Sequence, residues 1–276
     1  MLGRIALLLL IPMTFLGSVL AQDQPQARDL EPLSIVAMQI PWLLDEKKPG
    51  PYNKMVDELL LTYGDNVNVK ILPLRRAMRH FFKGNADCFF VGDYDEAYFR
   101  GSYLSRESVT VSRPFNTASI RAFTRRGAEP VRSIEDLYDR RIAIDLGVGG
   151  SIRIKKLFPN LTNTVDSLNA GQAHAMLIKG RVEAVLMMDY DYELYATRHP
   201  ERERLTASTN FEFERVDDAL MCKKNQRTHA LINHVNARIT DMKQSGMLAA
   251  LLRPHGRPIT TQTANHSEDQ DRLALK

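Results

Sequence analysis

The chain has little of what stabilises disulfide-rich or metal-binding domains. Its 276 residues include two cysteines, Cys88 and Cys222, which are too few for a disulfide scaffold and lack the paired spacing of a zinc site. The sequence leaves open whether these two cysteines pair with each other. Because 44% of the residues are hydrophobic, the chain has enough apolar side chains for an ordinary globular core.

Neither sign of charge dominates, and this excludes one class of partner. The 37 basic and 33 acidic residues give a formal net charge of +4, and the two signs are interleaved along the chain. Binding to nucleic acid depends on a basic arm or stripe, which this pattern does not form. We therefore expect no nucleic acid among the partners.

Long hydrophobic runs are absent after the first one. Residues 5–20 form an uncharged apolar run behind Arg4, and short side chains precede a cleavage site after Ala21. We predict a signal peptide over 1–21 and a soluble periplasmic product, with no lipid anchor because no cysteine follows the cleavage site. An uncleaved membrane anchor is the alternative, but the run is short for a bilayer and has no positive flank after it.

From residue 33 onward, strand-like and helix-like patterns alternate. Strands are predicted at 33–38, 67–71 and 86–91, and helices at 51–63 and 73–83. The first helix repeats apolar residues at a three-and-four spacing before Gly64 ends it, and Tyr52 belongs to this face, so we expect Tyr52 in the core. The alternation predicts parallel βαβ units, whose strands end at the rim where ligands bind.

An internal repeat indicates a second unit of the same kind. Lys83-Gly84-Asn85-Ala86-Asp87 is answered by Lys179-Gly180-Arg181-Val182-Glu183, and both segments are typical of a helix end, a glycine cap and a buried strand. A strand at 141–146 runs into a glycine-rich turn at 147–151, from which another helix starts. The pattern favours two similar α/β lobes over the alternative of two unrelated helix caps.

Six segments, taken in order, carry a family resemblance. They are Gly50-Pro51-Tyr52 with Asp57; Lys83 to Asp87; Val109 to Phe115; Ile134 to Leu137 followed by Arg141 to Ile144; Lys179 to Ala184 with Asp189; and Ala219 to Lys224 leading into a long helix and Ser245 to Leu248. In this order the chain resembles the extracellular solute-binding proteins of family 3, which have the type II periplasmic binding fold and serve amino-acid ABC importers. The resemblance covers about residues 33 to 256.

The resemblance implies an α/β fold of two lobes, each a mostly parallel sheet flanked by helices. A two-strand hinge would cross between the lobes near 109–115 and 213–222. The first lobe would then hold 33–112 plus 217–256 and the second 113–216. We expect the polar tail at 257–276 to be flexible.

The resemblance also implies a function. The protein would be a monomer that captures a small polar ligand between its lobes and delivers it to the membrane permease of an ABC importer. A sensing protein that signals to a membrane receptor is the alternative. We expect no cofactor and no enzymatic activity, because the seven histidines are scattered and no nucleophile is paired with a base, although some relatives of this fold are enzymes.

One departure from the family concerns the group that would hold a ligand carboxylate. Amino-acid binders of this family carry a Thr-x-x-Arg element before the hinge, whereas Arg100 and Arg106 stand out of that register here. Arg75 and Arg76, at the start of a predicted helix, are candidates for the same task because a guanidinium and free N–H groups both favour anions. Solvent-exposed arginines on a polar helix face are the alternative.

Five further positions complete the predicted ligand site. Trp42 follows the first strand and would cover the ligand, or else belong to the core. Gly149 and Ser151 lie in a glycine-rich turn whose N–H groups would hold an anion, and the turn lacks the third glycine of a dinucleotide-binding fingerprint. Asp93 and Asp189 would bind a ligand amine, although Asp189 also suits the start of a helix.

Overall fold

The structure is a computed structural model that describes residues 31–92, 99, 103–148, 150–208 and 211–253. The predicted signal peptide at 1–21 and tail at 257–276 lie outside these residues. The strands are β1 (Leu33–Gln39), β2 (Val67–Pro73), β3 (Cys88–Gly92), β4 (Val109–Val111), β5 (Asn116–Thr124), β6 (Ile142–Asp145), β7 (Thr164–Ser167), β8 (Ala184–Met188), β9 (Thr206–Ala207) and β10 (Glu214–Lys223). The helices are α1 (Pro51–Leu60), α2 (Leu74–Phe82), α3 (Gly150–Leu157), α4 (Ala170–Ile178), α5 (Asp189–Arg198), α6 (Gln226–Gln244) and α7 (Met247–Leu252).

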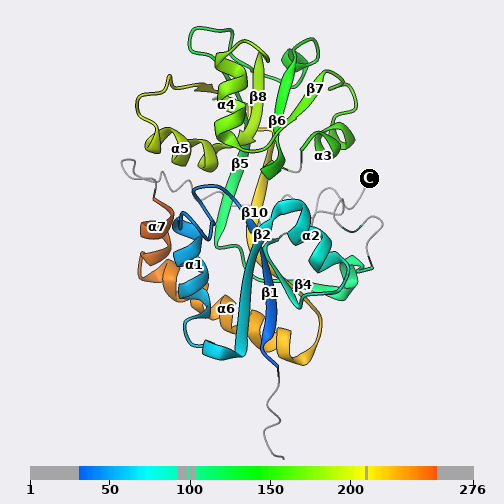
Figure 1. Cartoon of the computed structure of the whole chain (residues 1–276), viewed down its shortest axis with the longest axis vertical. Helices are drawn as coiled ribbons and strands as arrows, with labels where there is room; N and C mark the ends of the chain where they lie inside the picture. Colours follow the sequence, from blue (N-terminus) through cyan, green and yellow to red (C-terminus); the bar gives the residue numbers. More distant parts are fainter. Residues whose placement is uncertain (1–30, 93–98, 100–102, 149, 209–210, 254–276) are drawn as a thin grey trace, which may run out of the picture. The chain divides into compact units, whose positions relative to one another are not determined.

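The strands follow the order β2-β1-β3-β10-β5-β8-β6-β7, and the mixed α/β class is confirmed. The first sheet consists of β1 to β4 with Ala219–Lys223 of β10, and the second of β5 to β9 with Glu214–Asp218 of β10. Strand β1 is parallel to β2 and β3, as β6 is to β7 and β8. Figure 1 shows β5 and β10 side by side between the two sheets. The lobe boundaries given above stay a prediction.

The internal repeat is confirmed in three dimensions. Gly84 after α2 and Gly180 after α4 have φ of 80° and 65°, the left-handed region that glycine enters without steric penalty. In each repeat, the acidic side chain that follows accepts a hydrogen bond from a backbone N–H in, or just before, the neighbouring parallel strand. Asp87 accepts from the Ser34 N–H at 2.8 Å, and Glu183 from the Arg141 N–H at 2.9 Å. The same arrangement of helix, glycine and strand therefore occurs in both sheets.

Helix α1 is shorter than the sequence predicts. It ends at Leu60, and a separate 3-10 turn spans Gly64–Asn66, so the predicted end at residue 63 is wrong by one turn. Leu61 is 66% exposed, so its side chain adds no packing that would favour a longer helix. The N–H of Tyr63 instead bonds the carbonyl of Leu60 and closes a tight turn.

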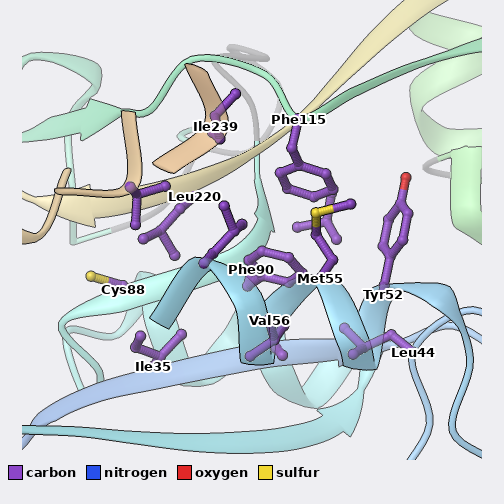
Figure 2. Packing of buried hydrophobic residues seen from close by; sticks show 14 of the residues in the cluster. Ile35, Leu44, Tyr52, Met55, Val56, Cys88, Phe90, Phe115, Leu220 and Ile239 are labelled. Carbon is purple, nitrogen blue, oxygen red and sulfur yellow. The ribbon is translucent and has the colours of Figure 1, made fainter. Parts of the chain in front are cut away.

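The core of the first sheet lies under α1 and α6. Tyr52, Met55 and Leu59 of α1 are buried against the same cluster as the long helix α6. Figure 2 shows Met55, Phe90 and Phe115 pointing toward one another, and the rings of Phe90 and Phe115 stack at 5.0 Å. Burying each such side chain stabilises the fold by about 1.5–3 kcal/mol. The expectation that Tyr52 is a core residue is confirmed, since its side chain is fully buried.

The two cysteines form a disulfide bond. Cys88 of β3 and Cys222 of β10 lie opposite each other on neighbouring antiparallel strands, and both are completely buried. The bond closes a loop between positions 134 residues apart, which spans every strand of the second sheet. A loop of this length makes a disulfide effective, because it restricts the unfolded chain strongly.

Removing this bond should lower the free energy of unfolding by about 2–5 kcal/mol. The double variant Cys88→Ala and Cys222→Ala tests this in urea titrations beside the oxidised wild type. A reductant should shift the wild-type midpoint toward that of the double variant and leave the double variant unchanged. Equal midpoints for oxidised wild type and double variant would show that the bond contributes nothing.

Candidate functional site

A cavity of about 720 Å³ lies where the two sheets present the carboxyl ends of their parallel strands. This volume is within the range of small-molecule sites. The first sheet supplies the ends of β1 and β2 with the start of α2, and the second supplies β6, β7 and the first turns of α4 and α5. Its lining residues are Met38, Gln39, Ile40, Pro41, Trp42, Pro73, Leu74, Arg75, Asp145, Leu146, Gly147, Asp166, Leu168, Asn169, Ala170 and Asp191.

Asp145 ends β6 at the cavity wall. Its side chain is 5% exposed, one carboxylate oxygen accepts from the Gly147 N–H at 2.6 Å, and the other is buried without a hydrogen-bond partner. Burial raises the pKa of Asp145 from 3.8 to about 6, because the Gly147 N–H offsets only part of the lost hydration. A buried carboxylate without a cation is destabilising, and such groups mark functional sites.

Asp191, in the first turn of α5, brings a second carboxylate to the same wall. A Cβ added to Gly147 would lie 2.9 Å from Asp145 Oδ1 and 3.6 Å from Asp191 Oδ2, so a glycine here leaves room for both groups. Burial, and then the negative charges of Asp145, Asp218 and Asp189, raise the pKa of Asp191 well above its ordinary value. Within the described residues, no donor or cation binds Asp191.

A hydrogen-bonded cluster ties helix α1 to the crossing strands β5 and β10. The Tyr52 hydroxyl donates to Asp218, and Asn116 donates to both the Asp218 carboxylate at 3.1 Å and the Tyr52 oxygen at 2.6 Å. The ring of Tyr190 stacks on Tyr52 with centroids 6.1 Å apart. Burial is the main reason that the pKa of Tyr52 lies well above its ordinary value, so this residue stays a donor. The cluster fixes the start of α5 that carries Asp191.

Trp42 joins the loop after β1 to the end of α5. Its indole has Lys48 at 4.8 Å and Arg198 at 5.4 Å from the ring, and His199 meets it edge-on at 5.7 Å. The cations that contact the indole are therefore side chains of the protein itself, which form cation–π contacts with it. Trp42 has φ of 72°, a left-handed conformation that is rare for a bulky residue. The ring therefore lines the cavity in a fixed position.

The structure brings some of the predicted site residues together and not others. Trp42 and Arg75 line the cavity, whereas Arg76 is an exposed residue of α2 outside the lining. Ser151 lies in the first turn of α3, and its side chain is not among those described. Asp93 and Gly149 lie outside the described residues.

Asp189 starts α5 but does not line the cavity. Its carboxylate accepts from the N–H groups of Ser119 and Tyr190 at 3.1 and 2.8 Å and lies 3.5 Å from the Arg121 guanidinium. Burial, opposed by these partners, raises its pKa. The structure thus gives Asp189 protein partners, and its role toward a ligand amine stays a prediction.

Sequence reasoning missed Asp145 and Asp191, although a signal existed for the first. Asp145 is the last residue of an apolar strand and stands two residues before the glycine-rich turn, where parallel sheets place ligand-binding side chains. Asp191 stands two residues after Asp189 in a helix, and the sequence shows no reason to choose one over the other.

No helix in the described part of the chain is long and apolar enough to cross a membrane. The described residues also contain no group of three or more His, Cys, Asp or Glu side chains that could hold a metal ion.

Comparison with known proteins yields matches among solved structures alone. No family model matches the chain, and no curated protein matches it. A histidine kinase sensor domain similar to periplasmic binding proteins matches at 14% identity and TM-score 0.63, over 81% of this chain and 96% of its own. The substrate-binding protein of an amino acid ABC transporter matches at 16% and 0.59, over 80% and 97%.

A third match is an ancestral amino acid-binding protein, AncCDT-1, described as a precursor of cyclohexadienyl dehydratase. It is 20% identical with TM-score 0.59, over 80% of this chain and 93% of that one. At these identities the likeness shows the fold. The chain has the two-lobed α/β fold of type II periplasmic binding proteins, as its sequence motifs imply.

Proposed function

We propose that this protein is a periplasmic solute-binding protein that captures a small, amine-bearing ligand in the cavity between its two sheets. The observation that carries the proposal is the pair Asp145 and Asp191, two carboxylates that no cation among the described residues binds, at the wall of a cavity of about 720 Å³. A ligand ammonium placed between them would supply the missing positive charge. The apolar remainder of the lining suits a ligand with a hydrocarbon body.

Delivery of the ligand to the permease of an ABC importer completes the proposal. The match to a substrate-binding protein of an amino acid ABC transporter supports this role, and the predicted signal peptide supports a periplasmic location. A sensing role is the second candidate, favoured by the match to a histidine kinase sensor domain. Genes for a permease and an ATPase beside this one would favour import, and a receptor kinase or cyclic-dinucleotide enzyme would favour sensing.

The proposal is of a binding protein and not of an enzyme, although one match is to a dehydratase precursor. The described cavity wall holds no histidine, cysteine or serine side chain that pairs a nucleophile with a base. What the wall holds is charged groups and apolar contact area, which suit binding.

Ligand-dependent thermal unfolding tests the function. We expect at least one compound from a panel of amino acids, polyamines, short peptides and organic anions to stabilise the protein. At 100 times its Kd, a ligand adds about 2.7 kcal/mol, which raises Tm by roughly 5–10 °C in a protein of this size. A folded protein whose Tm no compound in the panel raises would contradict the proposal.

A further inference from the structure

We propose that the ligand of the cavity is an organic dication, such as an α,ω-diamine, and not a neutral or acidic amino acid. This inference rests on the proposed solute-binding function and adds the class of ligand to it. It follows from the carboxylates of the described cavity wall and from the lack of free donors for an anion at the starts of α4 and α5.

The described lining is rich in carboxylates. Asp145, Asp166 and Asp191 line the cavity, and Arg75 is the one cationic side chain among the described lining residues. Arg75 is exposed, so water screens its charge, whereas Asp145 is 5% exposed and keeps one carboxylate oxygen without a partner. A cleft lined mainly by one sign of charge favours ligands of the opposite sign.

One ammonium group does not neutralise this wall. Asp145 and Asp191 both approach Gly147, so when both carboxylates are ionised a single cation between them leaves one negative charge of the pair unbalanced. Asp166 on β7, the strand next to β6, also lines the cavity, but it interacts with another group of the protein, so its charge is left out of this balance. A second positive charge on the ligand offsets the remaining negative charge. A zwitterion brings no net positive charge to the cavity.

Of the helix starts at the described wall, those of α4 and α5 offer little to a ligand carboxylate, and that of α2 has only the exposed Arg75 beside it. The first turn of α5 already holds Asp189 and Asp191, whose negative charges oppose an anion at that helix end. The first turn of α4 is capped by its own Asn169, which accepts from the Gln172 N–H at 3.0 Å. Ile40, Leu146 and Leu168 offer contact to methylene groups instead.

An inorganic cation fits the described wall less well than an organic one. Divalent cations take six or more oxygen ligands, and the described residues contain no group of three or more candidate metal ligands. The cavity is also far larger than one ion, so an extended molecule fills it better.

Calorimetry with compounds matched in length tests the inference at pH 7.5. Putrescine carries two ammonium groups, butylamine one, and 4-aminobutyrate one ammonium and one carboxylate on the same four-carbon chain; cadaverine, agmatine, glutamine, glutamate and Ca²⁺ complete the set. We expect putrescine, cadaverine or agmatine to bind at least ~10-fold more tightly than butylamine, a difference of about 1.4 kcal/mol, and no binding of 4-aminobutyrate.

Asp145→Asn and Asp191→Asn should each weaken dication binding by roughly 30-fold or more. The variant Asp241→Asn, at an exposed position on α6, should leave dication binding unchanged.

The outcomes separate the inference from the proposed function. Binding of glutamine, glutamate or 4-aminobutyrate at least as tightly as the best dication, and weakened by Asp145→Asn, would overturn the dication and leave a solute-binding protein. Dication binding that neither Asp variant weakens would overturn the inference as well. If Ca²⁺ alone binds, or nothing in this set or the wider panel binds, the proposed function fails too.

Discussion

Asp145→Asn should make the unliganded protein more stable at pH 7.5 while it weakens ligand binding. The pKa of Asp145 is about 6 in the folded state and 3.8 in the unfolded chain. Between these two pH values the folded state therefore binds more protons than the unfolded state. Stability therefore falls as the pH rises from about 4 to above 6. At 1.36 kcal/mol per pKa unit, the ionised group destabilises the fold by about 3 kcal/mol at neutral pH.

Urea unfolding at pH 7.5 and pH 4 checks this prediction. Replacing the carboxylate by an amide of the same shape should raise the free energy of unfolding by about 2–3 kcal/mol at pH 7.5 and change it little at pH 4. Asp241→Asn, on the exposed face of α6, is the matched control and should change stability by less than about 0.5 kcal/mol at either pH. A variant that is less stable than the wild type at pH 7.5 would show that Asp145 supports the fold.

Gly50→Ala should destabilise the protein and disturb the cavity. A Cβ at Gly50 would lie 2.0 Å from the carbonyl oxygen of Trp42 and 2.6 Å from that of Leu43. Both are backbone atoms, and the backbone at Trp42 is already held in a left-handed conformation, so no flexible side chain can yield. We expect a loss of about 3 kcal/mol or more in the free energy of unfolding, together with weaker ligand binding because Trp42 lines the cavity.

Gly64→Ala separates this clash from a general effect of removing glycine. Gly64 has open space around it but a φ of 51°, so its substitution should lower stability by about 1 kcal/mol and leave binding unchanged. The emission of Trp42, the only tryptophan, should shift in Gly50→Ala and stay unchanged in Gly64→Ala. If Gly50→Ala has the stability and emission spectrum of the wild type, the close packing of this loop is not what holds Trp42.

The repeated units were the most predictable part of the fold. A glycine at the end of a helix and an apolar strand after it are local features, and the Gly84 and Gly180 segments therefore predicted the equivalent places of β3 and β8. The end of α1 was less predictable, since Tyr63 continues the apolar pattern and packs against the core from a turn outside the helix.

The site was predictable in outline but not in its carboxylates. Trp42 and Arg75 follow strands, and the rule that ligands bind at the carboxyl ends of parallel strands indicated their place. The choice between Asp189 and Asp191 depends on which way each side chain leaves the first turn of α5. The partners that occupy Asp189, the N–H of Ser119 and the guanidinium of Arg121, come from a strand about 70 residues earlier, which no local pattern reveals.

The central claim is that Asp145 and Asp191 hold the positive charge of the ligand, and the proton count of binding tests it most directly. Calorimetry of the tightest-binding dication at pH 6, in two buffers of different ionisation enthalpy, measures the protons released. Because both carboxyl pKa values are raised in the unliganded protein, a bound cation should expel protons from them. The account predicts a net release of protons by the wild type that is lost in the double variant Asp145→Asn and Asp191→Asn. Tight binding with no proton release, or with the same release in the double variant, would contradict it.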